Sequence, residues 1–153
     1  MKNIFTPIAL MIFVNCFISA QTWEKITFSS TINSIGVNSD GDIFVGSDSA
    51  DIYRSTNGAQ SFQKINVLSG ADYSYTINDI TFTSSGAVVV YIFQPSPANN
   101  YRGIYISTDN GSTWERQLAP TLVSTIFCDD DRIYVSFGDG GDGYSYSDDF
   151  GNN

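Results

Sequence analysis

The chain has 153 residues, no histidine and a net charge of −9 at pH 7. The absence of histidine removes the commonest general base and the commonest transition-metal ligand, which argues against zinc chemistry. The negative charge, with no cluster of lysine or arginine, argues against nucleic acid as a partner. We predict neither a metal nor any other cofactor.

The first twenty residues have the layout of a secretory signal peptide. Lys2 supplies the positive start, residues 4–17 are apolar but short for a membrane span, and Ala20 is a small residue at the expected cleavage site. We predict a signal peptide over 1–20 and a mature chain that is secreted, to the extracellular space or the periplasm, with no membrane span. An uncleaved anchor and a lipoprotein acylated on Cys16 are the alternatives.

The mature chain contains a repeat. Residues 31–37 recur 45 residues later as 76–82 and, less closely, after another 45 residues as 121–127. Each copy is followed by a second β-branched and aromatic run, and tight turns such as Asp40-Gly41 separate the two runs, as in antiparallel hairpins. Two more strands complete the pattern. In chain order, the expected strands are 31–37, 42–45, 52–55, 60–65, 76–82, 87–90, 104–107, 112–117, 121–127, 132–135 and 144–147.

A turn rich in small polar residues follows the third strand of each copy. Ser107–Trp114 reads Ser-x-Asp-x-Gly-x-Thr-Trp in full, and residues 55–62 and 147–153 are partial copies. An Asp or Asn side chain can accept backbone N–H bonds here, glycine supplies a positive φ, and hydroxyls satisfy the remaining polar groups. We therefore predict a structural role for these turns. The residues are Ser55, Asn57, Ser61, Phe62, Ser107, Asp109, Gly111, Thr113, Trp114, Ser147, Asp149 and Gly151.

This motif resembles the Asp-box, or bacterial neuraminidase repeat (BNR), of sialidase-like β-propellers. The resemblance implies an all-β fold of four-stranded antiparallel propeller blades, with the signal peptide in front. Blade 1 is expected over 31–66, blade 2 over 76–118, and blade 3, lacking its outer strand, over 121–153. Residues 21–28 match the fourth strand of a blade and are predicted as a lone outer strand.

Three blades are too few to close a ring, since propellers typically have four to eight. The sequence is therefore interpreted as the N-terminal fragment of a longer propeller. The alternative is a homodimer in which two copies form a six-bladed ring, each N-terminal strand completing the last blade of the other copy.

The candidate ligand site lies in the connections between second and third strands. These run over 46–51, 91–103 and 136–143, and insertions that gather on one face of a repeat array often mark its binding face. The alternative is that the aromatic residues there extend strands and cover the core. The link over 70–75, between the fourth strand of blade 1 and the first strand of blade 2, is expected on the same face and adds two tyrosines. The candidate ligand-binding residues are Tyr73, Tyr75, Phe93, Tyr101 and Arg102.

Enzymatic activity has less support. Sialidases of the family use an arginine cluster, whereas Arg54, Arg102, Arg116 and Arg132 are not expected to converge. Glycosidases need a carboxylate pair, and no pair stands out among Asp48, Asp51, Asp72 and Asp139. The acidic runs 129–131 and 138–143 lack the spacing of a calcium loop. We predict no catalytic residue and a secreted module that binds a glycan or an extracellular protein; a fragment of a sialidase-like or xyloglucanase-like glycoside hydrolase is the alternative.

One cysteine, Cys128, remains after cleavage, so no disulfide forms within the mature chain. It lies in an apolar segment, and the chain has no histidine to act as its base. We predict a small, buried side chain with an unreactive thiol.

Overall fold

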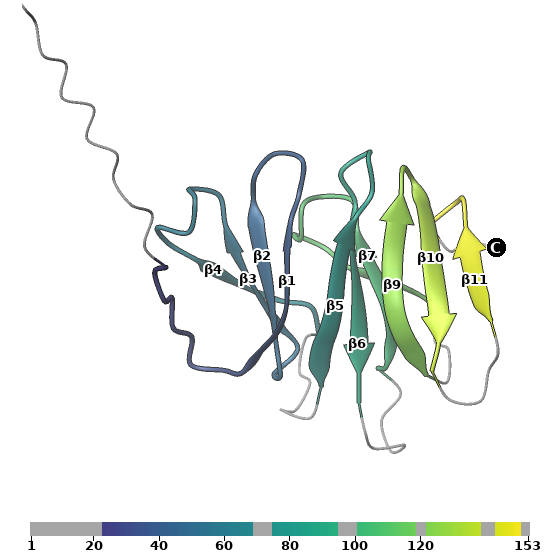
Figure 1. Ribbon diagram of the computed structural model, residues 1–153, viewed down its shortest axis with the longest axis horizontal. Coiled ribbons are helices and arrows are strands. Elements are labelled where there is room, and N and C mark those ends of the chain that lie inside the picture. The colour runs from purple at the N-terminus through teal and green to yellow at the C-terminus, as the bar shows by residue number, and fades with distance from the viewer. Residues whose placement is uncertain (1–22, 69–74, 95–100, 119–121, 139–142, 151–153) are drawn as a thin grey trace, which may run out of the picture.

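The computed structural model describes residues 23–68, 75–94, 101–118, 122–138 and 143–150; the predicted signal peptide lies outside them. Eleven strands form three antiparallel sheets, and the described residues contain no helix (Figure 1). The predicted fold class, an all-β protein of propeller-like blades, is confirmed. Blade 1 contains β1 (Ile32–Val37), β2 (Ile43–Ser47), β3 (Asp51–Ser55) and β4 (Gln63–Asn66); blade 2 contains β5 (Thr76–Phe82), β6 (Val88–Phe93), β7 (Gly103–Ser107) and β8 (Glu115–Leu118); blade 3 contains β9 (Val123–Asp129), β10 (Arg132–Phe137) and β11 (Tyr144–Ser147).

Strands that follow one another in the chain pair with one another in every blade. The first strand of each blade lies at its inner edge, because β1 contacts β5 and β5 contacts β9 (Figure 1). The blades therefore stand face to face around their first strands, as in a propeller.

Two apolar clusters hold the blades together, one in each space between neighbouring sheets. The first contains Phe44 and Ile52 of blade 1 and Val88 and Val90 of blade 2. The second contains Val89 of blade 2 with Ile126, Ile133 and Val135 of blade 3. Both faces of blade 2 are thus covered, which explains why β6 reads Val-Val-Val-Tyr-Ile-Phe without polar alternation.

Two glycines let blades 1 and 2 approach closely at their inner strands. A Cβ atom on Gly46 would lie 2.6 Å from Cγ2 of Ile77, and one on Gly36 would lie 2.6 Å from Cε2 of Phe82. Beside Gly46, the Ser34 hydroxyl donates a 2.9 Å hydrogen bond to the carbonyl of Ile77. Any side chain at position 46 would push the two blades apart.

The segment before blade 1 lies on the outer face of that blade. The ring of Phe28 packs against Tyr53 and Phe62, with centroid distances of 4.9 and 5.1 Å. Residues 23–28 belong to no strand, although the sequence predicts an outer strand over 21–28. A strand needs a neighbour to form its ladder, and no described strand pairs with this segment, so the outer strand stays a prediction.

Candidate functional site

The ends of the blades differ in what they carry. At one end, here called the turn face, the β1–β2, β5–β6 and β9–β10 turns meet the turns that follow β3 and β7. The backbone N–H of Ser84 donates to the carbonyl of Asp130 at 2.9 Å, and the Asp131 carboxylate accepts from the N–H of Ser85 at 2.8 Å. The opposite end, where β6 ends and β7 begins, is called the loop face.

The turn after β7 is closed by side-chain hydrogen bonds. The Asp109 carboxylate accepts from the Thr113 backbone N–H at 2.8 Å, the Thr113 hydroxyl at 2.6 Å and the Ser107 hydroxyl at 2.7 Å. The Ser107 oxygen in turn accepts from the Gly111 N–H at 2.8 Å, and the Trp114 indole donates to the Gly111 carbonyl at 3.1 Å. Every polar residue singled out in this turn therefore fastens the chain to itself.

The turn after β3 repeats this arrangement with different residues. The Asn57 side chain accepts from the Ser61 N–H at 3.0 Å and donates to the Ser61 hydroxyl at 2.8 Å, and the Ala59 N–H donates to Ser55 at 3.0 Å. Phe62 packs against Phe28. In blade 3 the Ser147 hydroxyl donates to Asp149 at 2.7 Å, and Gly151 lies outside the described residues.

The turns after β3 and β7 place their fourth and fifth residues in the left-handed region. The φ angles are 65° and 68° for Gly58 and Ala59, and 59° and 91° for Asn110 and Gly111. Phe150, the fourth residue of the third turn, has φ of 58°. Only glycine adopts this conformation without a steric cost, so Ala59 and Phe150 are strained.

Replacing Ala59 by glycine is expected to raise the free energy of unfolding by about 0.5–1 kcal/mol, because glycine relieves the steric cost at φ of 68°. Urea denaturation followed by tryptophan fluorescence measures the change. The matched control is Gly58→Ala, which adds the same strain at the preceding position and should destabilise by a similar amount. A change of the same sign in both variants would contradict the explanation, since one should stabilise the fold and the other should destabilise it.

Three hydrogen bonds to one carboxylate also shift its ionisation. The bonds from the Thr113 hydroxyl and N–H and from Ser107 lower the pKa of Asp109 from 3.8 to about 2. Because the folded pKa is depressed, the ionised carboxylate stabilises the fold above pH 3.8, and that contribution is lost as the pH falls toward 2.

Asp109→Asn should therefore remove part of the acid sensitivity of the fold between pH 4 and pH 2. Asn57 already performs the same turn closure in blade 1, so the variant is expected to fold. Unfolding curves at several pH values test this, with Asp40→Asn as the control at an exposed turn position. An unchanged pH slope in Asp109→Asn would show that this carboxylate does not couple to folding.

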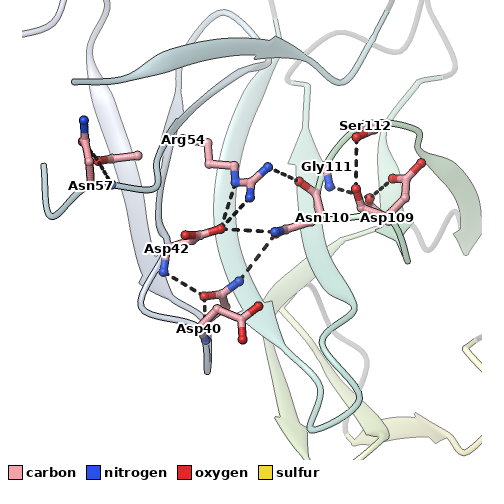
Figure 2. Close-up of polar contacts among 11 residues, drawn as sticks. Asp40, Asp42, Arg54, Asn57, Asp109, Asn110, Gly111 and Ser112 are labelled. Carbon is pink, nitrogen blue, oxygen red and sulfur yellow. Dashed lines mark hydrogen bonds and ion pairs between the residues drawn. The ribbon is translucent and has the colours of Figure 1, made fainter. Parts of the chain in front are cut away.

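A polar network on the turn face joins blade 1 to blade 2 (Figure 2). The Arg54 guanidinium donates two bonds to Asp42 Oδ2, at 2.6 and 3.1 Å, and a third to the Asn110 carbonyl at 3.2 Å. Asn110 returns a 3.1 Å bond from its side-chain nitrogen to the same Asp42 oxygen. The bond to Arg54 holds the pKa of Asp42 below its ordinary value. Sequence reasoning missed this network, although an arginine two residues after Ile52, on the same buried face, is a signal that a partner must exist.

The five predicted ligand-binding residues have different surroundings. Tyr75 is only 1 % exposed and belongs to the cluster between blades 1 and 2, so it is a core residue rather than one that a ligand can reach. Phe93 packs against the cluster between blades 2 and 3. Tyr73 lies outside the described residues. For Tyr75 and Phe93 the structure matches the alternative in which aromatic residues of this region cover the core.

Tyr101 and Arg102 form the part of the predicted site that reaches the surface of the loop face. Tyr101 is 50 % exposed, and its ring packs edge-on against Tyr75 at 5.7 Å. Its carbonyl accepts from the Tyr105 hydroxyl at 2.7 Å, and the Arg102 carbonyl accepts from the Arg116 guanidinium at 2.6 Å. Burial raises the pKa of Tyr105, which keeps that phenol protonated as a donor. Two side chains thus hold the backbone that presents the Tyr101 ring.

The charged residues near this face have local partners. The Asp51 carboxylate forms a 2.7 Å ion pair with Lys64, and Asp48 accepts from the Ser49 hydroxyl at 3.3 Å. Asp72 and Asp139 lie outside the described residues. Arg132 lies at the turn face instead, beside the β9–β10 turn, where it pairs with Asp148 and lies 4.8 Å above the Tyr146 ring. Within the described part of the chain, no three His, Cys, Asp or Glu side chains are grouped so that they could hold a metal ion.

Cys128 is partly buried beside the second apolar cluster. Burial raises the pKa of its thiol to about 11, so the thiol is protonated at neutral pH. A protonated, partly buried thiol is a poor nucleophile, as predicted.

The sequence matches no family model and no curated protein. None of the described residues forms a helix long and apolar enough to span a membrane.

Proposed function

We propose that this chain is a secreted, non-catalytic module built from Asp-box propeller repeats, and that the loop face of blade 2 binds a glycan or a protein outside the cell. The observation that carries the proposal is the half-exposed Tyr101 ring on a backbone held by Tyr105 and Arg116. An exposed aromatic ring offers a flat apolar surface for the C–H face of a sugar or for an apolar side chain.

A rigid position matters because binding otherwise loses free energy to the ordering of side chains and loops. Here the Tyr101 ring rests on Tyr75, and the carbonyls of Tyr101 and Arg102 are both bonded. Tyrosine also adds little conformational entropy cost, since it has two side-chain torsions. The network around Tyr101 therefore supports a prearranged contact residue.

Tyr101→Ala is expected to weaken binding about tenfold or more, the effect of removing a central aromatic contact. The secreted chain is screened against immobilised polysaccharides and extracellular protein fractions, and the affinity for each ligand retained is then measured by calorimetry. Tyr101→Phe keeps the ring and should bind within a fewfold of the original chain. Asp40→Ala, at an exposed position of the turn face, is the remote control.

Two results would contradict the proposal. Equal affinity of Tyr101→Ala and the original chain would remove Tyr101 from the contact. Cleavage of a bound polysaccharide, detected as new reducing ends, would favour the glycoside hydrolase alternative.

A further inference from the structure

Blade 3 has an exposed face made of four aromatic side chains, here called the aromatic face. Tyr134 lies at its centre, with ring centroids 6.3 Å from Phe127, 6.4 Å from Tyr144 and 6.1 Å from Tyr146. Phe127, Tyr144 and Tyr146 are 59 %, 68 % and 56 % exposed. Grouped apolar side chains of this kind mark a surface that binds a partner.

The other two blades show what covers the same positions. Phe44 and Val89 precede Tyr134 at the 45-residue spacing, and both are fully buried under the next blade. Ile52 and Ile104 stand where Tyr144 stands, three residues before the serine of the turn, and they are also buried. The aromatic face therefore corresponds to a surface that the following sheet covers twice within this chain.

The outer edge of blade 3 also differs from the edges of the other blades. In blades 1 and 2 the third strand pairs with a fourth, β3 with β4 and β7 with β8. Among the described residues β11 pairs with β10 alone. Its other edge presents backbone N–H and C=O groups that can pair with an added strand.

The segment Trp23–Ile26 has the sequence of such a strand. Trp23-Glu24-Lys25-Ile26 matches Phe62-Gln63-Lys64-Ile65 and Trp114-Glu115-Arg116-Gln117, each of which consists of the residue before β4 or β8 and the first three residues of that strand. Trp23 is fully exposed and Ile26 is 43 % exposed. The segment therefore carries two exposed apolar side chains, and no described strand pairs with its backbone.

Phe28 already holds this segment in the corresponding place. Val67 follows Phe62 by five residues and is buried in the cluster that contains Tyr105 and Trp114 of the next blade. Phe28 follows Trp23 by five residues and packs on Tyr53 and Phe62, the counterparts of Tyr105 and Trp114 in blade 1. The segment thus lies against blade 1 as an outer strand of a preceding blade would lie.

We propose that a second copy of this chain supplies a fourth strand to blade 3: Trp23–Ile26 of one copy pairs with β11 of another. The two elements lie at opposite ends of one chain, so they do not meet within it (Figure 1). The chain order of the blades then fixes the rest of the contact. Within one chain, β4 completes blade 1 and is followed by β5 of blade 2, which covers blade 1. In the same way, residues 23–28 of the second copy complete blade 3 and are followed by β1. Blade 1 of the second copy therefore covers the aromatic face. Ile35 and Val37, which are 68 % and 58 % exposed, are buried in that contact.

The association is head-to-tail, because the two surfaces are different. The association uses β11, the aromatic face and blade 1, so it does not depend on whether the loop face binds a ligand. Light scattering after size-exclusion chromatography of the secreted chain, over a range of concentrations, is expected to give a mass of two copies or more. Hydrogen exchange is expected to show the amides of β11 becoming protected as concentration rises.

A matched pair of variants tests the strand itself. Glu24→Pro with Lys25→Pro removes backbone donors from the segment, whereas Glu24→Ala with Lys25→Ala alters the same side chains and keeps them. Both positions lie outside the blade ladders, so both variants should keep the circular dichroism of the original chain. The proline pair should weaken association about tenfold or more relative to the alanine pair.

A peptide of residues 21–28 provides a second measurement that does not depend on a variant. In excess it should dissociate the assembly and protect β11 as the second copy does. A monomer at every concentration would overturn the proposal. So would an assembly that the proline pair leaves intact and that leaves the β11 amides unprotected.

Discussion

Replacing Phe44 by alanine is expected to lower the free energy of unfolding by about 3–5 kcal/mol, as for other large aromatic residues in a core. Phe44 is fully buried at the centre of the space between blades 1 and 2. Its ring lies 5.3 Å from Phe82 and carries the Arg54 guanidinium 5.7 Å above it. The substitution leaves a cavity between two sheets that the turn-face network holds in place. Urea denaturation gives the measured difference.

The control for Phe44→Ala is Phe127→Ala, at a phenylalanine that is 59 % exposed. It should change stability by less than about 0.5 kcal/mol when measured at concentrations where copies are separate. A loss of similar size in both variants would show that burial between blades is not the source of the effect. A small loss in Phe44→Ala would mean that the two blades close around the cavity.

The strand pattern could be predicted from the sequence because each strand is a local apolar run with turn residues at both ends. The starts of the fourth strands differ most from the prediction. The sequence places them at 60–65 and 112–117, whereas β4 and β8 begin at Gln63 and Glu115. The hydrogen bonds of Asn57 to Ser61 and of Asp109 to Thr113 keep the preceding residues in the turns. These side-chain hydrogen bonds compete with the backbone hydrogen bonds of the sheet. The strand propensity of the residues does not reveal which set of bonds forms.

The candidate site could be predicted only in part. Tyr75 and Tyr101 are the same residue type in neighbouring connections, yet one is buried and the other is half exposed. Blade 2 is covered on both faces, so alternation along its strands does not distinguish core residues from surface residues. Exposure there depends on how the blades stack, which joins residues far apart in sequence.

The Asp42–Arg54–Asn110 network shows the same limit, because Asp42 and Asn110 are 68 residues apart. Arg54→Ala is expected to lower the free energy of unfolding by about 3 kcal/mol. The side chain of Asp42 is only 12 % exposed, so loss of its partner leaves a largely buried carboxylate with one amide donor from the next blade. The loss should be measured by urea denaturation at neutral pH.

The pH dependence of the same variant identifies the carboxylate. In the original chain the pKa of Asp42 is lowered, first by its hydrogen bond to Arg54, so its ionised form stabilises the fold above pH 3.8. This contribution is lost as the pH falls below that value. Without Arg54 the pKa of Asp42 should rise, and the difference in stability between Arg54→Ala and the original chain should shrink in acid. A difference that stays constant with pH would assign the loss to packing of the arginine stem.

The boundary between blades 2 and 3 has apolar residues at the positions that the polar network occupies between blades 1 and 2. Ala87, Ile106 and Phe150 stand where Asp42, Arg54 and Asn110 stand, and all three belong to or pack against the second apolar cluster. Phe150 has the same left-handed backbone as Asn110, with φ of 58° against 59°. The combined variant Asp42→Ala, Arg54→Ile, Asn110→Phe should therefore recover part of the stability that Arg54→Ala loses, because well-packed apolar groups can replace a buried ion pair at little cost. The recovery is not complete, because the left-handed backbone strains a phenylalanine at position 110 as it strains Phe150. If the combined variant were no more stable than Arg54→Ala, the two boundaries would not be interchangeable, and the polar contacts would be required by the geometry of blades 1 and 2.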